Sequence, residues 1–435
     1  MIAEDSKARY VAAFEEAKKN NAGPAWLKDL RQAGIASFAA QGFPTTKQEE
    51  WKYTSVEPIA SREWRRPGAF DGPVDTERLL ALSFADAESP RLVFINGLPV
   101  PRLSRVPELP RGARLASLAE LIAQNEPLLS EELGRHANFR SQAFVALNTA
   151  FLGEGAVVAV PPGCRLAEPI HLIYASAAGQ IAAHPRTLIF LGAGSEAKIV
   201  ESYVGLSEES YFCNAVTELI GAADSVAEHY RVQREGPGGF HTGALDADLA
   251  RGARLTAHAV TLGGSLIRNH VHVALNGEGA ECALNGLYIA GARQHVDNYT
   301  EIDHLKPHAT SFELYKGILS GAAHGVFNGK IVVHKDAQKS DARQVNKNLL
   351  LSANAVVNTK PQLEIHADDV KCSHGSTIGQ LDGDALFYLR SRGLGLEEAR
   401  SLLSFAFAAD VVARIKIDFL RARLEQYLAA QFEKV

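Results

Sequence analysis

The feature that most constrains this chain is a stretch from Ala156 to about Ile378 that lacks helical periodicity. Short β-branched runs alternate there with Gly, Asn and Asp, as in VVAVPPG, TLIFLGAGSEAKIV and ECALNGLYIAG. Because no helices separate the strands, the pattern excludes an α/β sheet and leaves a large sandwich or barrel, or a parallel β-helix. Hairpin dipeptides are few and Asn recurs near the corners, which favours the β-helix. No clear hexapeptide period appears, so the left-handed type is disfavoured.

Helical periodicity is confined to the parts of the chain before and after this stretch. Tyr10, Phe14 and their neighbours recur at helix spacing within residues 1 to about 65, and the helical pattern returns from about Leu115 to Leu147. A further helical region follows Gly393. We therefore predict a mainly β protein with three parts. These are an N-terminal helical region with its connecting segment over residues 1–150, a parallel β-helix over 151–384 and a C-terminal helical domain over 385–435. The last helices are expected to cap the open end of the β-helix, to dock a partner, or both.

Composition limits the kinds of partner and the cell compartment that we expect. The formal net charge is -5 and no concentrated basic surface is evident, so nucleic acid is not an expected partner. The charged N-terminal stretch lacks the apolar core of a signal peptide, and no run of eighteen apolar residues predicts a membrane span. Four cysteines occur without a CxxC pair. This pattern is typical of a reducing environment and predicts a cytoplasmic protein.

The residues best suited to chemistry gather between Thr359 and Gly379, in TKPQLEIHADDVKCSHGSTIG. The stretch opens as a strand and then places His366, two aspartates, Cys372 and His374 close together. If the backbone stays extended, Cys372 and His374 project from one face of the sheet. A thiolate beside an imidazole suits zinc, iron or a sulfur-transfer intermediate. The alternative is a charged, solvated strand end with one buried cysteine.

Other catalytic motifs are absent from the sequence. The nearest match to a nucleotide phosphate loop, from Gly325 to Ile331, is one residue short and ends in Ile, so it predicts a turn. Neither GxSxG nor HExxH occurs. The acid-rich EIDH at Glu301 to His304 resembles the site of a β-helix polysaccharide lyase in composition only. A stand-alone carbohydrate-active enzyme is therefore kept as an alternative function.

Several motifs together resemble the SufD family, scaffold components of the SUF system for iron–sulfur cluster assembly. They run in the family's order through most of the chain. They are EEWKYT (49–54), FINGLPV (94–100), AFVALNTAFL (143–152), SDARQVNKNLLLS (340–352), KPQLEIHADDVKCSHGSTIG (360–379), FYLRSRGL (387–394) and FAFAADVV (405–412).

The resemblance implies a right-handed parallel β-helix and a non-catalytic scaffold. In that family the chain pairs with its paralogue SufB across the β-helices and offers its C-terminal helices to the SufC ATPase, which hydrolyses the ATP. Homodimers are a further expectation. The resemblance assigns cluster assembly at the SufB interface to His374, with Cys372 beside it, as transient ligands of iron or of a nascent cluster. No cofactor is expected to stay bound to the chain alone, because it lacks a cluster-type cysteine spacing.

The SufC docking helix implied by the resemblance spans residues 396 to 412, where Leu396, Ala399, Leu403 and Phe407 recur at helix spacing. Its predicted contact residues are Leu396, Leu403, Phe405, Phe407 and Val411. A third hypothesis keeps the same fold but treats Cys372 and His374 as inert, which would make the chain a structural adaptor only.

Overall fold

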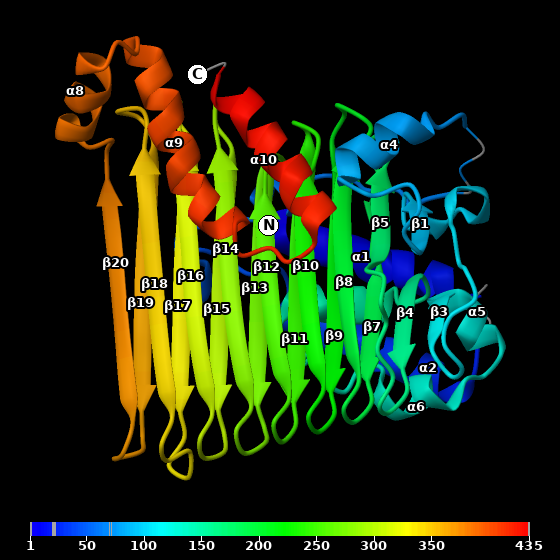
Figure 1. Cartoon of the computed structure of the whole chain (residues 1–435). Coiled ribbons are helices and arrows are strands. Elements are labelled where there is room, and N and C mark those ends of the chain that lie inside the picture. Colours follow the sequence, from blue (N-terminus) through cyan, green and yellow to red (C-terminus); the bar gives the residue numbers. More distant parts are fainter. Residues whose placement is uncertain (1, 20–22, 69, 71, 434–435) are drawn as a thin grey trace.

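Two long sheets face each other and run the length of the molecule (Figure 1). The computed structural model describes residues 2–19, 23–68, 70 and 72–433. Successive strands alternate between the sheets, and within each sheet a strand pairs in parallel with the strand of the next coil. The result is a β-solenoid of about 8 turns with helices at both ends of the chain. The predicted mainly β, parallel β-helix architecture is confirmed.

Each coil gives one strand to each sheet. The first sheet contains β5 (Ile170–Ser176), β8 (Glu196–Gly205), β10 (Val226–Arg234), β12 (Arg254–Thr261), β14 (Glu281–Ala290), β16 (Thr310–Leu319), β18 (Asp341–Leu350) and β20 (Lys371–Gly379). The second contains β4 (Gly155–Val160), β7 (Arg186–Leu191), β9 (Tyr211–Gly221), β11 (Gly239–Leu249), β13 (Leu266–Leu275), β15 (His295–His304), β17 (His324–Val333) and β19 (Val356–Ile365), with the short β6 (Ala182–Ala183) beside β9.

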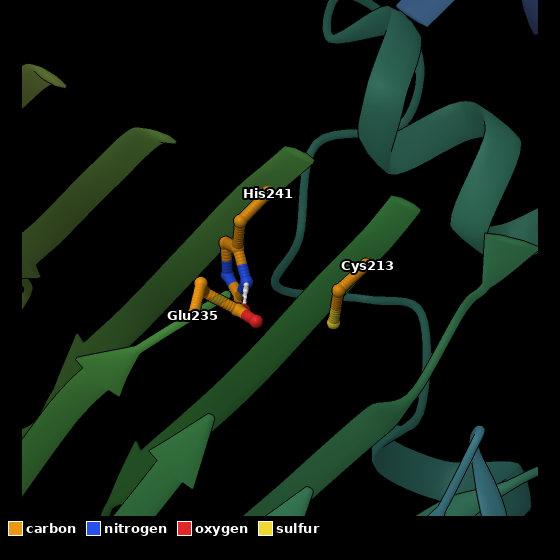
Figure 2. Close-up of side chains that lie close together, drawn as sticks. All are labelled: Cys213, Glu235 and His241. Carbon is orange, nitrogen blue, oxygen red and sulfur yellow. Dashed lines mark hydrogen bonds and ion pairs between the residues drawn. The ribbon is translucent and has the colours of Figure 1, made fainter. Parts of the chain in front are cut away.

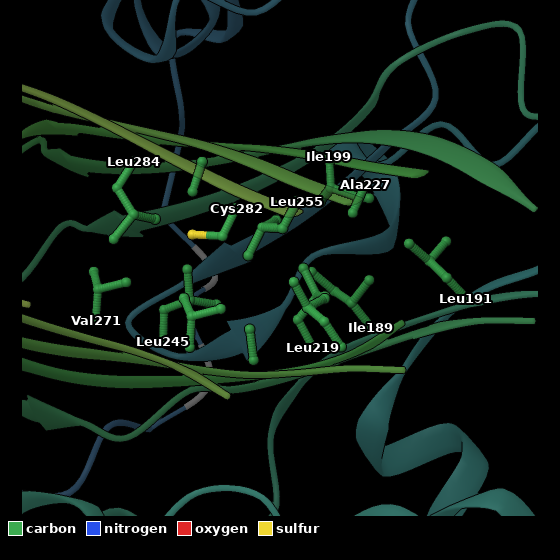
Figure 3. Packing of buried hydrophobic residues seen from close by; sticks show 14 of the residues in the cluster. Ile189, Leu191, Ile199, Leu219, Ala227, Leu245, Leu255, Val271, Cys282 and Leu284 are labelled. Carbon is green, nitrogen blue, oxygen red and sulfur yellow. The ribbon is translucent and has the colours of Figure 1, made fainter. Parts of the chain in front are cut away.

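The apolar core lies between the two sheets, where side chains of successive coils stack in register. Leu245 lies beside Val271 in one sheet, and Leu255 lies beside Cys282 in the other. Figure 3 shows these side chains pointing toward one another across the interior. Because strand side chains alternate, each inward position is repeated by the next coil and the core continues as a column.

The N-terminal region supplies helices and three further strands. Its elements are α1 (Ile2–Lys19), α2 (Ala25–Gln41), η1 (Glu49–Trp51), α3 (Glu57–Ala60), α4 (Thr76–Ser83), β1 (Arg91–Ile95), β2 (Leu98–Pro99), η2 (Pro101–Leu103), β3 (Arg114–Ser117), α5 (Leu118–Ala123), α6 (Pro127–Glu132) and α7 (Ala143–Ala150). Strand β1 extends the first sheet by pairing with β5, and β3 extends the second by pairing with β4. Both sheets therefore continue into the N-terminal region.

A buried ion pair fastens this region to the solenoid. Glu218 on β9 lies 3.2 Å from the guanidinium of Arg186 on β7, and both side chains are fully buried. The same carboxylate accepts hydrogen bonds from the backbone N–H groups of Gly134 and His136, at 2.9 and 3.0 Å. One side chain of the sheet thus holds the loop that connects α6 to α7.

The C-terminal helices are α8 (Gly383–Ser391), α9 (Leu396–Val412) and α10 (Asp418–Phe432). Helices α9 and α10 lie along the outer face of the first sheet (Figure 1), and α9 packs on β14 and β16. Lys316 of β16 is 2.7 Å from Asp410 of α9 and donates to the carbonyl of Phe407. The expectation that these helices cap the open end is wrong, because their apolar stripe covers the sheet face. No helix in the described part of the chain is long and apolar enough to cross a membrane.

Candidate functional site

The last coil of the solenoid, β19 and β20, has no neighbouring strand on its outer side among the described residues. Both strands end the order of their sheets, so each presents an unpaired backbone edge. Three apolar side chains of this coil are unusually exposed: Val356 is 51%, Ile365 43% and Ile378 47% exposed. This surface, which we name the end coil, combines open strand edges with apolar side chains, as an interface does.

Cys372 and His374 both lie on β20 and face into the open end. Their register partners on β18 are Ala342 and Gln344, which are buried inside the solenoid. The two side chains therefore share one face of the strand, as the i, i+2 spacing predicts. Cys372 is half-buried against the core, while His374 is exposed. Burial raises the pKa of the Cys372 thiol above its usual value, and nearby Asp341 adds to the rise.

The other polar residues of the motif do not join them. The carboxylate of Asp369 pairs with Lys339 in the preceding turn, and its backbone N–H donates to Gln338. On the opposite strand, Thr359 accepts a hydrogen bond from Ser376 at 3.0 Å, which links β19 to β20. Among the described residues, no third Cys, His, Asp or Glu joins Cys372 and His374 in a group with metal-ligand spacing. The end coil thus offers at most two ligands.

One group with that spacing lies inside the solenoid, and sequence reasoning did not predict it. The ligand atoms of Cys213, Glu235 and His241 lie within 4.8 Å of one another, and all three residues are buried (Figure 2). Glu235 is already engaged on both oxygens, by His241 Nδ1 at 2.8 Å and by the hydroxyl of Tyr211 at 2.6 Å. Burial raises the pKa of the Cys213 thiol, which disfavours the thiolate that a metal requires. These contacts occupy the carboxylate of Glu235 and one nitrogen of His241, whereas His241 Nε2 is buried without a partner among the described residues.

A second internal cluster joins Glu201, His229 and Arg231. Glu201 lies 2.9 Å from His229 and 3.6 Å from Arg231, and all three are buried. Despite the opposing effect of burial, the hydrogen bond from His229 and the neighbouring cations hold the pKa of Glu201 at about 2. In the sequence, such residues resemble the solvated positions of alternating strands. Their spacing of about one coil is the only signal that could have revealed the pairing.

The acidic side chains of the motif considered for carbohydrate chemistry, Glu301 and Asp303, form ion pairs. Lys330 lies 3.4 Å from both Glu301 and Glu364. Asp303 is held between His272 at 2.9 Å and His334 at 3.2 Å. His304, by contrast, is buried inside the solenoid. A cavity of about 1010 Å³ lies among the N-terminal helices and the first coils and shares no lining residue with this motif or with the end coil.

The predicted docking residues of α9 occupy three kinds of setting. Leu396 is 44% exposed, whereas Leu403, Phe405 and Phe407 are half-buried. Val411 is fully buried against the sheet, so it seats the helix and is not available to a partner. Other apolar side chains are more accessible: Phe387 and Tyr388 of α8 are 76% and 56% exposed, and Leu402 of α9 is 46% exposed.

Comparison with known proteins agrees with the motifs. Residues 173–407 match the family model for the SufBD core domain of SUF-system FeS cluster assembly, and residues 4–172 match the model for the SufBD N-terminal region. An iron–sulfur cluster assembly SufBD family protein of Synechocystis is 32% identical over 97% of this chain and 94% of its own. The iron–sulfur cluster assembly protein SufD of Escherichia coli is 33% identical, with 90% of each chain covered. The SufD protein of Bacillus subtilis is 25% identical over 95% of both.

These matches cover both the solenoid and the N-terminal region, and they confirm the resemblance drawn from the motifs. The chain belongs to the SufBD family of iron–sulfur cluster assembly proteins.

Proposed function

We propose that this chain is a non-catalytic scaffold subunit of a SUF assembly complex. It pairs with a SufB paralogue through the end coil and with a SufC ATPase through its C-terminal helices. The observation that supports this most directly is the end coil itself, where His374 and Cys372 stand beside exposed apolar side chains and unpaired strand edges. Iron and sulfide are the cargo of this surface, held only while the complex is assembled.

The small number of ligands in the end coil explains why a partner is needed. An imidazole and a thiol supply two of the four ligands that iron usually takes in sulfur-rich sites. The partner chain supplies the remaining ligands, and its strands cover the apolar side chains of the end coil. A homodimer formed through the same edges is the competing assembly. It would bring two copies of His374 together without adding a new kind of ligand.

Replacing Ile378 by Asp tests the pairing surface. The side chain is 47% exposed, so the fold should tolerate the change, but a carboxylate there would have to be desolvated at the interface. We expect at least a tenfold loss of SufB affinity, since burying one large aliphatic side chain is worth roughly 1.5–3 kcal/mol. Co-purification of the full chain with SufB and SufC measures this. Val106→Asp is the matched control, at 50% exposure in the N-terminal region. Undiminished SufB recovery with Ile378→Asp would place the interface elsewhere.

Replacing Leu396 and Leu402 by Glu tests ATPase docking. Both side chains are exposed on α9, so the substitutions should remove SufC from the purified complex while SufB stays bound. Ala422→Glu is the control, because it adds a glutamate at an exposed position of α10. SufC recovery is read from the subunit ratio after size-exclusion chromatography. A normal ratio in the double variant would contradict docking on this helix.

A further inference from the structure

Behind His374, two more polar side chains continue the same inward-facing column. Gln344 of β18 is its register partner, and Glu313 of β16 is the register partner of Gln344. Gln344 is 1% exposed and Glu313 is fully buried. The amide nitrogen Nε2 of Gln344 donates to the carboxylate of Glu313 at 2.7 Å. A polar ladder therefore leads from the solenoid interior to the open end at His374.

The facing sheet leaves space for the side chain of Gln344. Gly329 of β17 lies opposite, and a Cβ at that position would come within 2.3 Å of Gln344 Nε2. The amide consequently rests against backbone, where any side chain on residue 329 would displace it. Pro361 follows Gly329 on β19 and has no backbone N–H to offer. The interior at this level is shaped around the glutamine.

Two acceptor atoms of the ladder are unsatisfied, Glu313 Oε1 and Gln344 Oε1. Gln344 Oε1 is buried and accepts no hydrogen bond from any residue that the structure describes. Leaving such an acceptor unpaired costs about 1–3 kcal/mol. Since Nε2 is directed to Glu313, Oε1 is left to face the next position of the column. That position is His374, the register partner of Gln344 on β20, and an imidazole carries an N–H that can donate.

Glu313 fixes which way the amide points. Burial raises the pKa of its carboxyl to about 7, so both protonation states occur near neutral pH. A carboxylate accepts from Gln344 Nε2, and a neutral carboxyl still accepts through its carbonyl oxygen. The orientation of Gln344 is therefore the same in either state, and Oε1 stays on the His374 side.

We propose that Gln344 and Glu313 are positioning residues for His374. Gln344 Oε1 accepts the N–H of one imidazole nitrogen, which selects one tautomer and directs the other nitrogen's lone pair toward the partner chain. This rests on the proposed function of His374 as a ligand for iron. Metal-binding histidines usually donate their second nitrogen to such an acceptor, which orients the ring and raises its basicity.

The test is the tautomer of His374 in the isolated full chain, read by NMR of protein labelled with ¹⁵N-histidine. His374→Gln identifies the signal by its loss. In its neutral form, His374 of the native protein should show a single tautomer, and Gln344→Met should return it to the ordinary mixture. Asn346→Leu is the control, because it removes a buried amide from the same face of the same strand. A native mixture, or a tautomer unchanged by Gln344→Met, overturns the proposal.

Substitutions at Glu313 give a second, independent reading should Gln344→Met fail to fold. Glu313→Gln keeps an acceptor for Gln344 Nε2 and should leave the tautomer single, whereas Glu313→Met removes the acceptor and should restore the mixture. Identical spectra for the two variants contradict the ladder. These measurements need neither iron nor a partner, so they test the ladder separately from the proposed function. If cluster assembly in cells did not depend on His374, the proposed function would be contradicted. The hydrogen bond between Gln344 and His374 would not be.

Discussion

Replacing His374 by Ala should abolish support for iron–sulfur enzymes in cells while leaving the complex assembled. The side chain is exposed, so its loss should leave the fold intact and should lower the free energy of unfolding by no more than the one hydrogen bond proposed with Gln344, about 1 kcal/mol. The proposed site has only two ligands from this chain, and losing one should lower cluster formation by on the order of tenfold or more. The activity of iron–sulfur enzymes in cells that depend on this chain measures the effect.

Ser373→Ala is the matched control, because Ser373 adjoins His374 on the opposite face of β20. Iron and acid-labile sulfide in the co-purified complex should fall with His374→Ala and stay at the native level with Ser373→Ala. Normal enzyme maturation with His374→Ala would instead support the adaptor hypothesis, in which Cys372 and His374 are inert. Polysaccharide cleavage by the purified chain, which we do not expect, would support the carbohydrate-active alternative.

Replacing Glu218 by Ala should give the largest loss of stability, about 3–5 kcal/mol. The change removes the carboxylate that pairs with the buried guanidinium of Arg186, and it removes the acceptor for the backbone N–H groups of Gly134 and His136. Denaturant unfolding followed by circular dichroism measures it. The N-terminal region should also become more sensitive to protease near residue 134, because its anchor to β9 is lost.

Glu208→Ala provides the comparison, since this carboxylate is exposed in the turn before β9. It should change the unfolding free energy by less than about 0.5 kcal/mol. If Glu218→Ala were equally mild, the buried pair would not anchor the N-terminal region. An arginine that gains access to water would explain such a result.

The fold was predictable because strand alternation and corner residues are local properties. The position of the last helices was not. The stripe that includes Val411 predicts a buried face, but the pattern does not say which surface covers it, and the structure shows the outer face of the first sheet. Which surface the helices cover depends on how the residues of successive coils align. That alignment depends on the lengths of the coils, which follow no regular period in this sequence.

The candidate site was also predictable only in part. The spacing of Cys372 and His374 predicts their shared face, which the structure shows on β20. Gln344 and Glu313, which lie behind them in the solenoid, were not predicted. In the sequence, both resemble solvent-exposed positions of alternating strands. Only the stacking of three coils places these two side chains in one column with His374. Their spacing of about thirty residues in the sequence carries no local signal.

The end coil has a consequence for motion. An inner coil is hydrogen-bonded to a neighbour on both sides, whereas β19 and β20 are paired on one side only. In such a linear array the terminal unit is the first to fray, so amide hydrogen exchange should be fastest in the strand that carries His374. A partner that pairs with these edges acts as the missing next coil. Assembly and local folding are then a single event, and the ligands become rigid only when the complex is complete.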